Sequence, residues 1–165
     1  TKGEGIQGKR KRSIPVMSSS YKILESREVE QTKIELRDDG IIQFFYADNR
    51  EYTIEDTKIL EHAVDEMTKG VPHMSLRISG PYTIADIEIL RYLSKGRGTL
   101  FTMADAFVIH STPQKMLANF YLRVSKPILP TKFFNHVKDA EKWLLSLDKE
   151  DLARRHKLKI LQFEK

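Results

Sequence analysis

An apolar run that stops at a helix start is the feature that most constrains the fold of this chain. Residues 106–110 read Ala-Phe-Val-Ile-His, and Ser111, Thr112 and Pro113 then precede an amphipathic segment at 114–124. A short continuous apolar run is typical of a strand buried on both faces, as in parallel sheets covered by helices. The pattern predicts a buried strand that leads into a helix, with Thr112 as cap and Pro113 as first helical residue.

Other segments extend this unit to an α/β domain. Alternating or continuous apolar residues predict about five strands, at 33–37, 41–46, 74–79, 106–110 and 131–134. Apolar residues at helical spacing predict about four helices, at 53–70, 83–95, 112–124 and 135–147. Asp38-Asp39-Gly40 is typical of a hairpin turn between the first two strands. The fold class is therefore α/β, with a mixed sheet that begins with an N-terminal antiparallel hairpin and is flanked by helices.

Composition and charge divide the chain into three parts. Residues 1–20 hold five basic residues and one acid, and their scarcity of apolar residues predicts a flexible basic tail. The remaining 145 residues hold 23 basic and 22 acidic groups, so most of the net charge of +5 belongs to that tail. We expect the folded domain at 21–147 and a charged, peripheral helical extension at 148–165.

The sequence lacks the signals of a disulfide framework, a membrane span, a metal site and a phosphate-binding loop. The chain has no cysteine, which suits a reducing cytoplasm, and we expect a cytoplasmic location. No apolar run approaches the ~18 residues of a membrane span. The five histidines lack metal-ligand spacing, and residues 95–99 lack the full phosphate-loop pattern, so neither a metal nor a cofactor is expected.

Three segments near the end of the domain carry a family resemblance: 117–127, 130–134 and the Ala-Glu-Lys-Trp-Leu of 140–144. With the order of elements over 30–147, they resemble small bacterial STAS-type domains related to anti-sigma-factor antagonists. They also resemble uncharacterised bacterial proteins of that fold, which look like the CRAL-TRIO lipid-carrier domains. The resemblance implies a STAS-like fold and a phospho-regulated or ligand-sensing binding module, with no catalytic activity.

One departure from the family matters. Antagonists of this type carry an Asp-Ser-Ser-Gly-like motif with a phosphorylated serine where the third strand meets its helix. The matching stretch, residues 79–86, has no Ser-Ser-Gly, so the phosphorylation switch is not carried over. Thr83 is the nearest hydroxyl, and we interpret it first as a helix cap.

Five polar residues near predicted helix starts are the candidate ligand-binding residues: Ser79, Thr83, Ser111, Thr112 and Asn135. Free amides at a helix N-terminus attract anions, and Arg77, Lys95 or Arg97 would add charge if close. The plainer interpretation, favoured here, is that these residues only cap helices. We predict no catalytic residues, because neighbours such as His110 and Ser111 point to opposite faces of a strand.

Three functional hypotheses follow. The leading one is a non-enzymatic regulatory or binding module that acts through protein contacts, with a protein partner or a homo-oligomer. The second is a carrier or sensor of a small lipid-like or anionic ligand. The third, which we do not favour, is nucleic-acid binding through the basic runs at 9–12 and 154–159.

Overall fold

The structure is a computed structural model that describes residues 20–95 and 100–164. Its elements in chain order are β1 (Ile23–Val29), β2 (Thr32–Arg37), β3 (Ile41–Phe45), β4 (Glu51–Tyr52), α1 (Ile54–Thr68), β5 (His73–Ile78), β6 (Ile84–Ala85), α2 (Ile87–Lys95), β7 (Thr102–Val108), α3 (Thr112–Val124), β8 (Thr131–Phe134), α4 (Val137–Ser146) and α5 (Lys149–Phe163). The first 19 residues of the predicted tail, and residues 96–99 of the predicted loop, lie outside the described residues. Within the described part, no helix is both long enough and apolar enough to cross a membrane.

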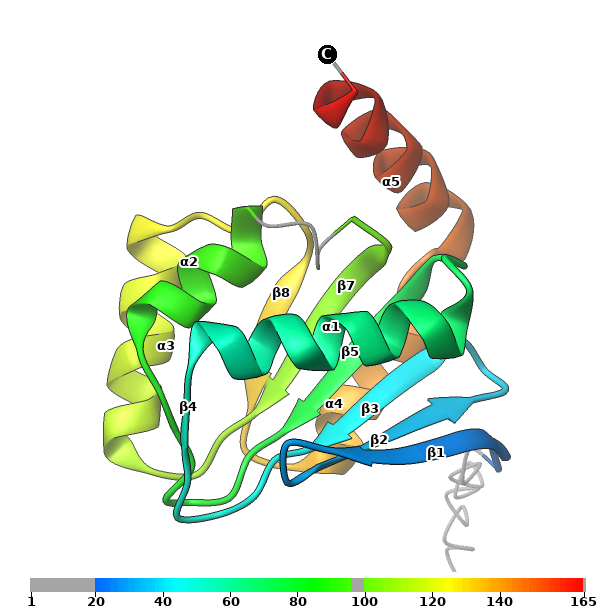
Figure 1. Cartoon of the computed structure of the whole chain (residues 1–165). Coiled ribbons are helices and arrows are strands. Elements are labelled where there is room, and N and C mark those ends of the chain that lie inside the picture. Colours follow the sequence, from blue (N-terminus) through cyan, green and yellow to red (C-terminus); the bar gives the residue numbers. More distant parts are fainter. Residues whose placement is uncertain (1–19, 96–99, 165) are drawn as a thin grey trace, which may run out of the picture.

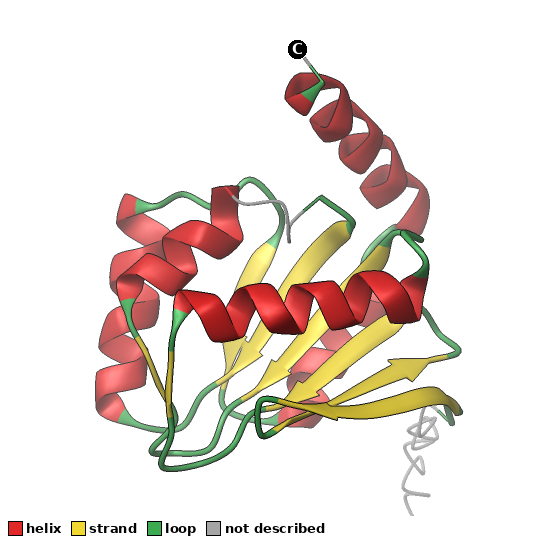
Figure 2. Cartoon of the chain, viewed as in Figure 1, coloured by secondary structure: helices red, strands yellow, loops and turns green. Residues whose placement is uncertain are grey.

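The central sheet has six strands in the order β1-β2-β3-β5-β7-β8 (Figures 1 and 2). β1, β2 and β3 are antiparallel neighbours, whereas β3, β5, β7 and β8 run parallel. Gly40, at a φ of +83°, takes the left-handed conformation in the β2–β3 turn. The predicted mixed sheet and its antiparallel hairpin are confirmed.

Three strands of the structure were not predicted from the sequence. β1 is an edge strand whose residues are all exposed or half-buried, so its sequence lacks the alternation of a half-buried strand. β4 and β6 are two residues each and pair in parallel as a separate small ribbon. Segments this short carry no periodicity. The central sheet thus has six strands, close to the predicted number of about five.

Helices cover both faces of the sheet and enclose two apolar cores. α1, α2 and α3 pack on one face, over a cluster that includes Phe44 and Phe107. α4 and the start of α5 pack on the other, over Met74, Ala106 and Val108 (Figure 1). Because successive strand residues point to opposite faces, β7 contributes to both cores. The predicted burial of residues 107–109 is confirmed.

The helix starts agree only in part with the predicted caps. Thr53 caps α1 through a reciprocal capping box with Asp56, as the sequence indicated. The predicted start at Thr83 is wrong, because residues 84–85 are extended in β6 and Asp86 Oδ1 accepts a hydrogen bond from the Ile89 amide. The predicted cap at Thr112 is also wrong.

The helix start after β7 lies one residue earlier than predicted. Ser111 caps α3, Thr112 is its first residue and Pro113 follows in the first turn. At α4, His136 occupies the cap position without a side-chain hydrogen bond, and Asn135 precedes it.

The predicted C-terminal helix is confirmed as α5, but it is not wholly peripheral. Leu152, His156 and Lys159 are buried, and His156 Nε2 hydrogen bonds to the carbonyl oxygen of Leu100. Arg154 and Arg155 both form ion pairs with Asp151. Within the basic run at 154–159, two residues are thus paired with an acid and two others, His156 and Lys159, are buried.

Lys159 gives a testable pH dependence. Burial lowers the pKa of its amine from 10.5 to about 8, and Nζ has no hydrogen-bond partner among the described residues. We expect Lys159→Met to raise the free energy of unfolding at pH 7 by about 1 kcal/mol, because a buried unpaired amine is removed. Urea unfolding at pH 7 and pH 10 measures this difference.

The sign of the pH effect follows from proton linkage. Between pH 8 and pH 10.5 the unfolded chain still holds the Lys159 proton that the folded protein has released. Stability of the unsubstituted protein therefore rises with pH in this window, and the advantage of Lys159→Met shrinks. An advantage that stays constant with pH would contradict the assignment. Lys157→Met, at an exposed position on the same helix, is the control.

Candidate ligand-binding cavity

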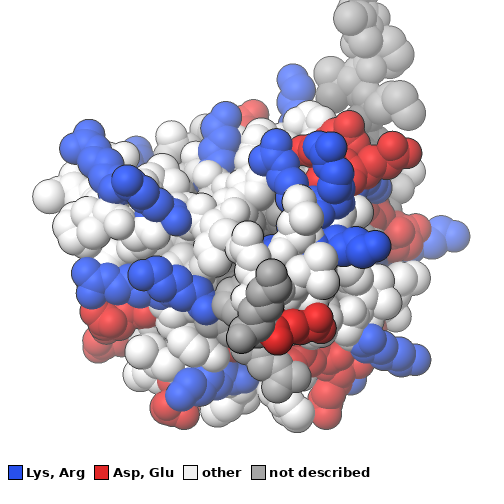
Figure 3. Space-filling view, turned by 90° about the horizontal axis from the view of Figure 1, so that it is seen from above, with Lys and Arg blue, Asp and Glu red and all other residues white. Residues whose placement is uncertain are grey.

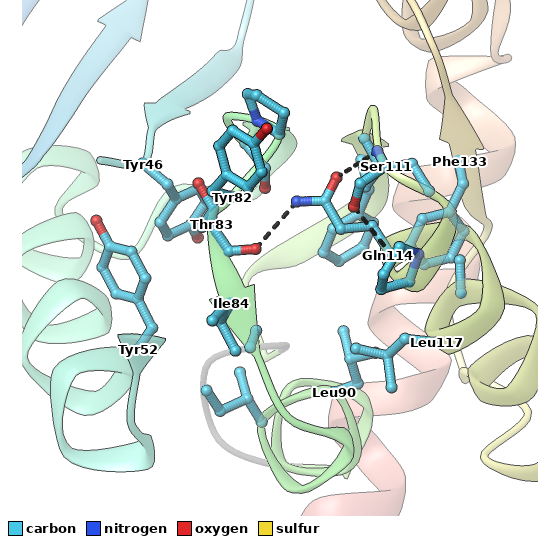
Figure 4. A pocket seen from close by; sticks show the side chains of 18 of the residues that line it. Tyr46, Tyr52, Tyr82, Thr83, Ile84, Leu90, Ser111, Gln114, Leu117 and Phe133 are labelled. Carbon is cyan, nitrogen blue, oxygen red and sulfur yellow. Dashed lines mark hydrogen bonds between the residues drawn. The ribbon is translucent and has the colours of Figure 1, made fainter. Parts of the chain in front are cut away.

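A cavity of about 480 Å³ lies on the α2–α3 side of the sheet. It opens where β5 and β7 end, between α2, α3 and the β4–β6 ribbon (Figure 4). The carboxyl ends of parallel strands are the usual binding position in open α/β sheets. Its lining consists of Tyr46, Tyr52, Thr57, Ser79, Pro81, Tyr82, Thr83, Ile84, Ala85, Ile89, Leu90, Leu93, Phe107, Ile109, Ser111, Pro113, Gln114, Leu117, Ala118 and Phe133.

The lining is uncharged and mostly apolar. None of the described residues that form it is Asp, Glu, Lys, Arg or His. Ile89, Leu90 and Leu93 come from α2, and Leu117 and Ala118 come from α3. These spacings are those of one helix face, so one face of each helix forms a cavity wall.

Thr83 fixes the loop that forms one wall. Its hydroxyl donates to the carbonyl oxygen of Ala47 at 2.9 Å and accepts from the amide of Gly80 at 2.9 Å. A Cβ on Gly80 would lie 2.6 Å from Cγ of Asp48, so only glycine allows this approach of the two loops. Asp48 in turn accepts from the amide of Tyr82 at 2.7 Å. Thr83 is buried structural support for the wall and not a helix cap.

Gln114 joins that loop to the start of α3 (Figure 4). Its Nε2 donates to the carbonyl oxygens of Gly80, at 2.8 Å, and Thr83, at 3.0 Å. Its Oε1 accepts from the amides of His110, at 2.8 Å, and Ser111, at 3.1 Å. Two amides just before the helix, those of His110 and Ser111, are therefore bound to the protein's own side chain.

A buried ion pair lies behind the cavity wall. Arg77 Nε donates to Asp105 at 2.9 Å, and Nη1 donates to the hydroxyl of Tyr46 at 3.0 Å. The guanidinium also stacks over the Phe44 ring, 4.7 Å from its centroid. Burial lowers the pKa of Arg77, but Asp105 and the Tyr46 hydroxyl raise it more, so the pKa lies above its ordinary value. Burial raises the pKa of Tyr46, which stays neutral.

The structure brings three of the five predicted site residues together. Ser79, Thr83 and Ser111 line the cavity, whereas Thr112 and Asn135 are exposed and lie outside its lining.

The basic residues that were expected to add positive charge to an anion-binding site do not line the cavity. Arg77 is paired with Asp105, Lys95 lies at the far end of α2, and Arg97 lies outside the described residues. No group of acidic, histidine or cysteine side chains in the described part of the chain could hold a metal ion.

Comparison with known proteins gives little functional information. A crystal structure of a protein of unknown function from Arthrobacter sp. FB24 is similar at 23% identity, covering 69% of this chain and 99% of that one, with a TM-score of 0.24. No curated protein matches the chain significantly. The resemblance to STAS-type and lipid-carrier domains stays a prediction. The model of the family described as a domain of unknown function (DUF7793) matches residues 34–148, and the chain belongs to this family.

Proposed function

We propose that this domain binds a small, uncharged and predominantly apolar molecule in the cavity between α2 and α3. The observation that carries the proposal is the cavity itself: about 480 Å³, with no charged residue in its described lining. Pockets for small molecules typically span about 300–1,000 Å³ and are lined mainly by apolar and aromatic side chains.

The electrostatics favour a neutral ligand over an anionic one. Arg77, which does not line the cavity, is already paired with Asp105 and donates to the hydroxyl of Tyr46, a residue of the lining. The amides of His110 and Ser111, just before α3, are occupied by Gln114. A carboxylate buried among these groups would have no partner, at a cost of several kcal/mol.

The proposed role is that of a carrier or sensor, without catalysis. The polar groups of Thr83 and Gln114 are engaged with the backbone, so they support the wall and do not act on a substrate. The lipid-carrier side of the sequence resemblance agrees with this role. Regulation through protein contacts, expected first from the sequence, would then depend on ligand occupancy.

Leu117→Trp tests the proposal by filling the cavity from α3. We expect the intact protein to bind the neutral dye Nile red with enhanced emission, and Leu117→Trp to weaken that binding at least about tenfold, because the larger ring occupies apolar space that the dye needs. The matched control is Leu122→Trp on the same helix, since Leu122 does not line the cavity. Fluorescence titration measures both variants.

A competition experiment tests whether the cavity prefers neutral ligands over charged ones. Decanol should displace the dye at lower concentrations than decanoate, which has the same chain and a charged head group. Native mass spectrometry of freshly purified protein should also show a bound apolar molecule. The proposal is overturned if the intact protein takes up no dye, or if Leu117→Trp and Leu122→Trp bind it equally.

A further inference from the structure

An exposed apolar stripe runs along α3. Met116, Phe120 and Val124 are spaced four residues apart and have exposed fractions of 67%, 46% and 52%. Side chains at this spacing lie above one another on one side of a helix. Only Ala118 and Tyr121 of α3 are buried. The stripe therefore lies on a helix that gives the protein's own core only a narrow face.

The stripe adjoins the cavity. At about 100° per residue, the Met116-Phe120-Val124 line lies next to Pro113 and Leu117, which line the cavity. On the facing segment, Tyr82 and the first residue of β6, Ile84, also line the cavity, and they are 66% and 55% exposed. Apolar surface thus continues from the outside of α3 into the cavity.

The charge along α3 has one sign, whereas the facing segment carries the exposed acidic residues Asp86 and Glu88. Between Asp105 and Asp139 the sequence contains no acidic residue and five basic ones: Lys115, Arg123, Lys126, Lys132 and Lys138. The first three lie on α3 or directly after it, and all three are exposed. Figure 3, seen from above, shows Lys and Arg side chains over the side where α2 and α3 lie, with Asp and Glu side chains at the lower left of that side.

We propose that α3 docks on an anionic lipid bilayer, with the Met116-Phe120-Val124 stripe in the interface and the basic residues at the head groups. Helices that lie on membranes combine an apolar face with Lys and Arg beside it. Docking would place the cavity mouth against the bilayer, from which an apolar ligand could enter without crossing water. This last step depends on the proposed function, whereas docking itself does not.

The same observations disfavour other partners for this face. A second copy docked through α3 would bring two basic surfaces together, and like charges oppose such contact. Nucleic acid would meet the basic side chains but would leave the apolar stripe in water. An anionic bilayer satisfies both the charge and the apolar surface.

Vesicle flotation with the full chain tests the proposal. We expect binding to phosphatidylcholine vesicles that contain about 30% phosphatidylglycerol, and little binding to phosphatidylcholine alone. Each basic residue near an anionic surface strengthens binding about fivefold, so Lys115→Gln with Arg123→Gln should weaken it about 25-fold. Met116→Ser with Phe120→Ser should weaken it about tenfold or more, because apolar contact is lost.

Matched controls lie on α5, where Leu158 and Leu161 are exposed apolar residues and Lys157 is an exposed cation. Leu158→Ser with Leu161→Ser, and Lys157→Gln, should leave vesicle binding unchanged. The proposal is overturned if the intact chain does not bind the anionic vesicles, or if both α3 variants bind as well as the intact chain.

Two further outcomes would assign the stripe to another role and also overturn the proposal. One is a dimer, seen by light scattering, that Met116→Ser with Phe120→Ser dissociates. The other is binding to nucleic acid in preference to vesicles. Nile red uptake by the intact chain and by Leu117→Trp, measured without vesicles, reports on the cavity, so failure of docking is distinguishable from failure of the proposed function.

Discussion

Replacing Asp105 by alanine is expected to lower the free energy of unfolding by about 3–5 kcal/mol, because it leaves a buried guanidinium without its counter-ion. The side chains of Arg77 and Asp105 are 8% and 5% exposed, and Arg77 Nε lies 2.9 Å from Asp105 Oδ1. Tyr46 supplies one hydrogen bond to Arg77 but no charge. Urea denaturation at pH 7 measures the loss.

Two controls separate the lost charge pair from other effects. Arg77→Met combined with Asp105→Ala should recover more than half of the lost stability, because no buried charge then remains. Lys58→Ala removes an exposed ion pair with Glu55 and should cost no more than about 0.5 kcal/mol. If Asp105→Ala cost as little as Lys58→Ala, the ion pair would not be buried as described.

A second large loss of stability is expected from a substitution on the opposite face of the sheet, at Leu144. This side chain is completely buried between α4 and the sheet, in the core that also contains Ala106 and Val108. We expect Leu144→Ala to lower the free energy of unfolding by about 2–5 kcal/mol, because it leaves a cavity in a packed core. Urea denaturation again provides the measurement.

Because Leu144 lies on the opposite face of the sheet, its replacement is not expected to change dye binding. At low urea, where Leu144→Ala is still folded, it should bind Nile red as the intact protein does, because the ligand cavity is on the other side of the sheet. Lys142→Ala, at an exposed position of the same helix, should change stability by less than about 0.5 kcal/mol. Loss of dye binding in folded Leu144→Ala would show that the two cores are coupled.

The parts of the fold that the sequence predicts well are those with a strong local signal. The β2–β3 hairpin has an alternating strand before its turn and an apolar strand after it, and its Gly40 takes the left-handed conformation. Phe107 lies in a continuous apolar run, and its burial follows from that run alone. β4 and β6 are not predictable in this way, because pairing between two distant dipeptides depends on tertiary structure.

The candidate site is harder to predict because its walls come from separate segments. The Ser-x-x-Gln pattern at Ser111 and Gln114 is a recognisable capping box, which would have identified the true cap of α3. Nothing local, however, indicates that Gln114 also reaches the carbonyl oxygens of Gly80 and Thr83. Whether Leu90 and Leu117 enclose space or contact each other is decided by the packing of α2 against α3.

The sheet keeps the two apolar cores apart, and this has an evolutionary consequence. The described cavity-lining residues come from the α2–α3 side and the adjoining loops, and none comes from α4 or α5. Substitutions at positions such as Ile84, Leu90 or Leu117 can therefore alter which molecule fits while Met74, Val108 and Leu144 continue to hold the opposite layer together. If the cavity binds a ligand as proposed, its preference can change without loss of the scaffold.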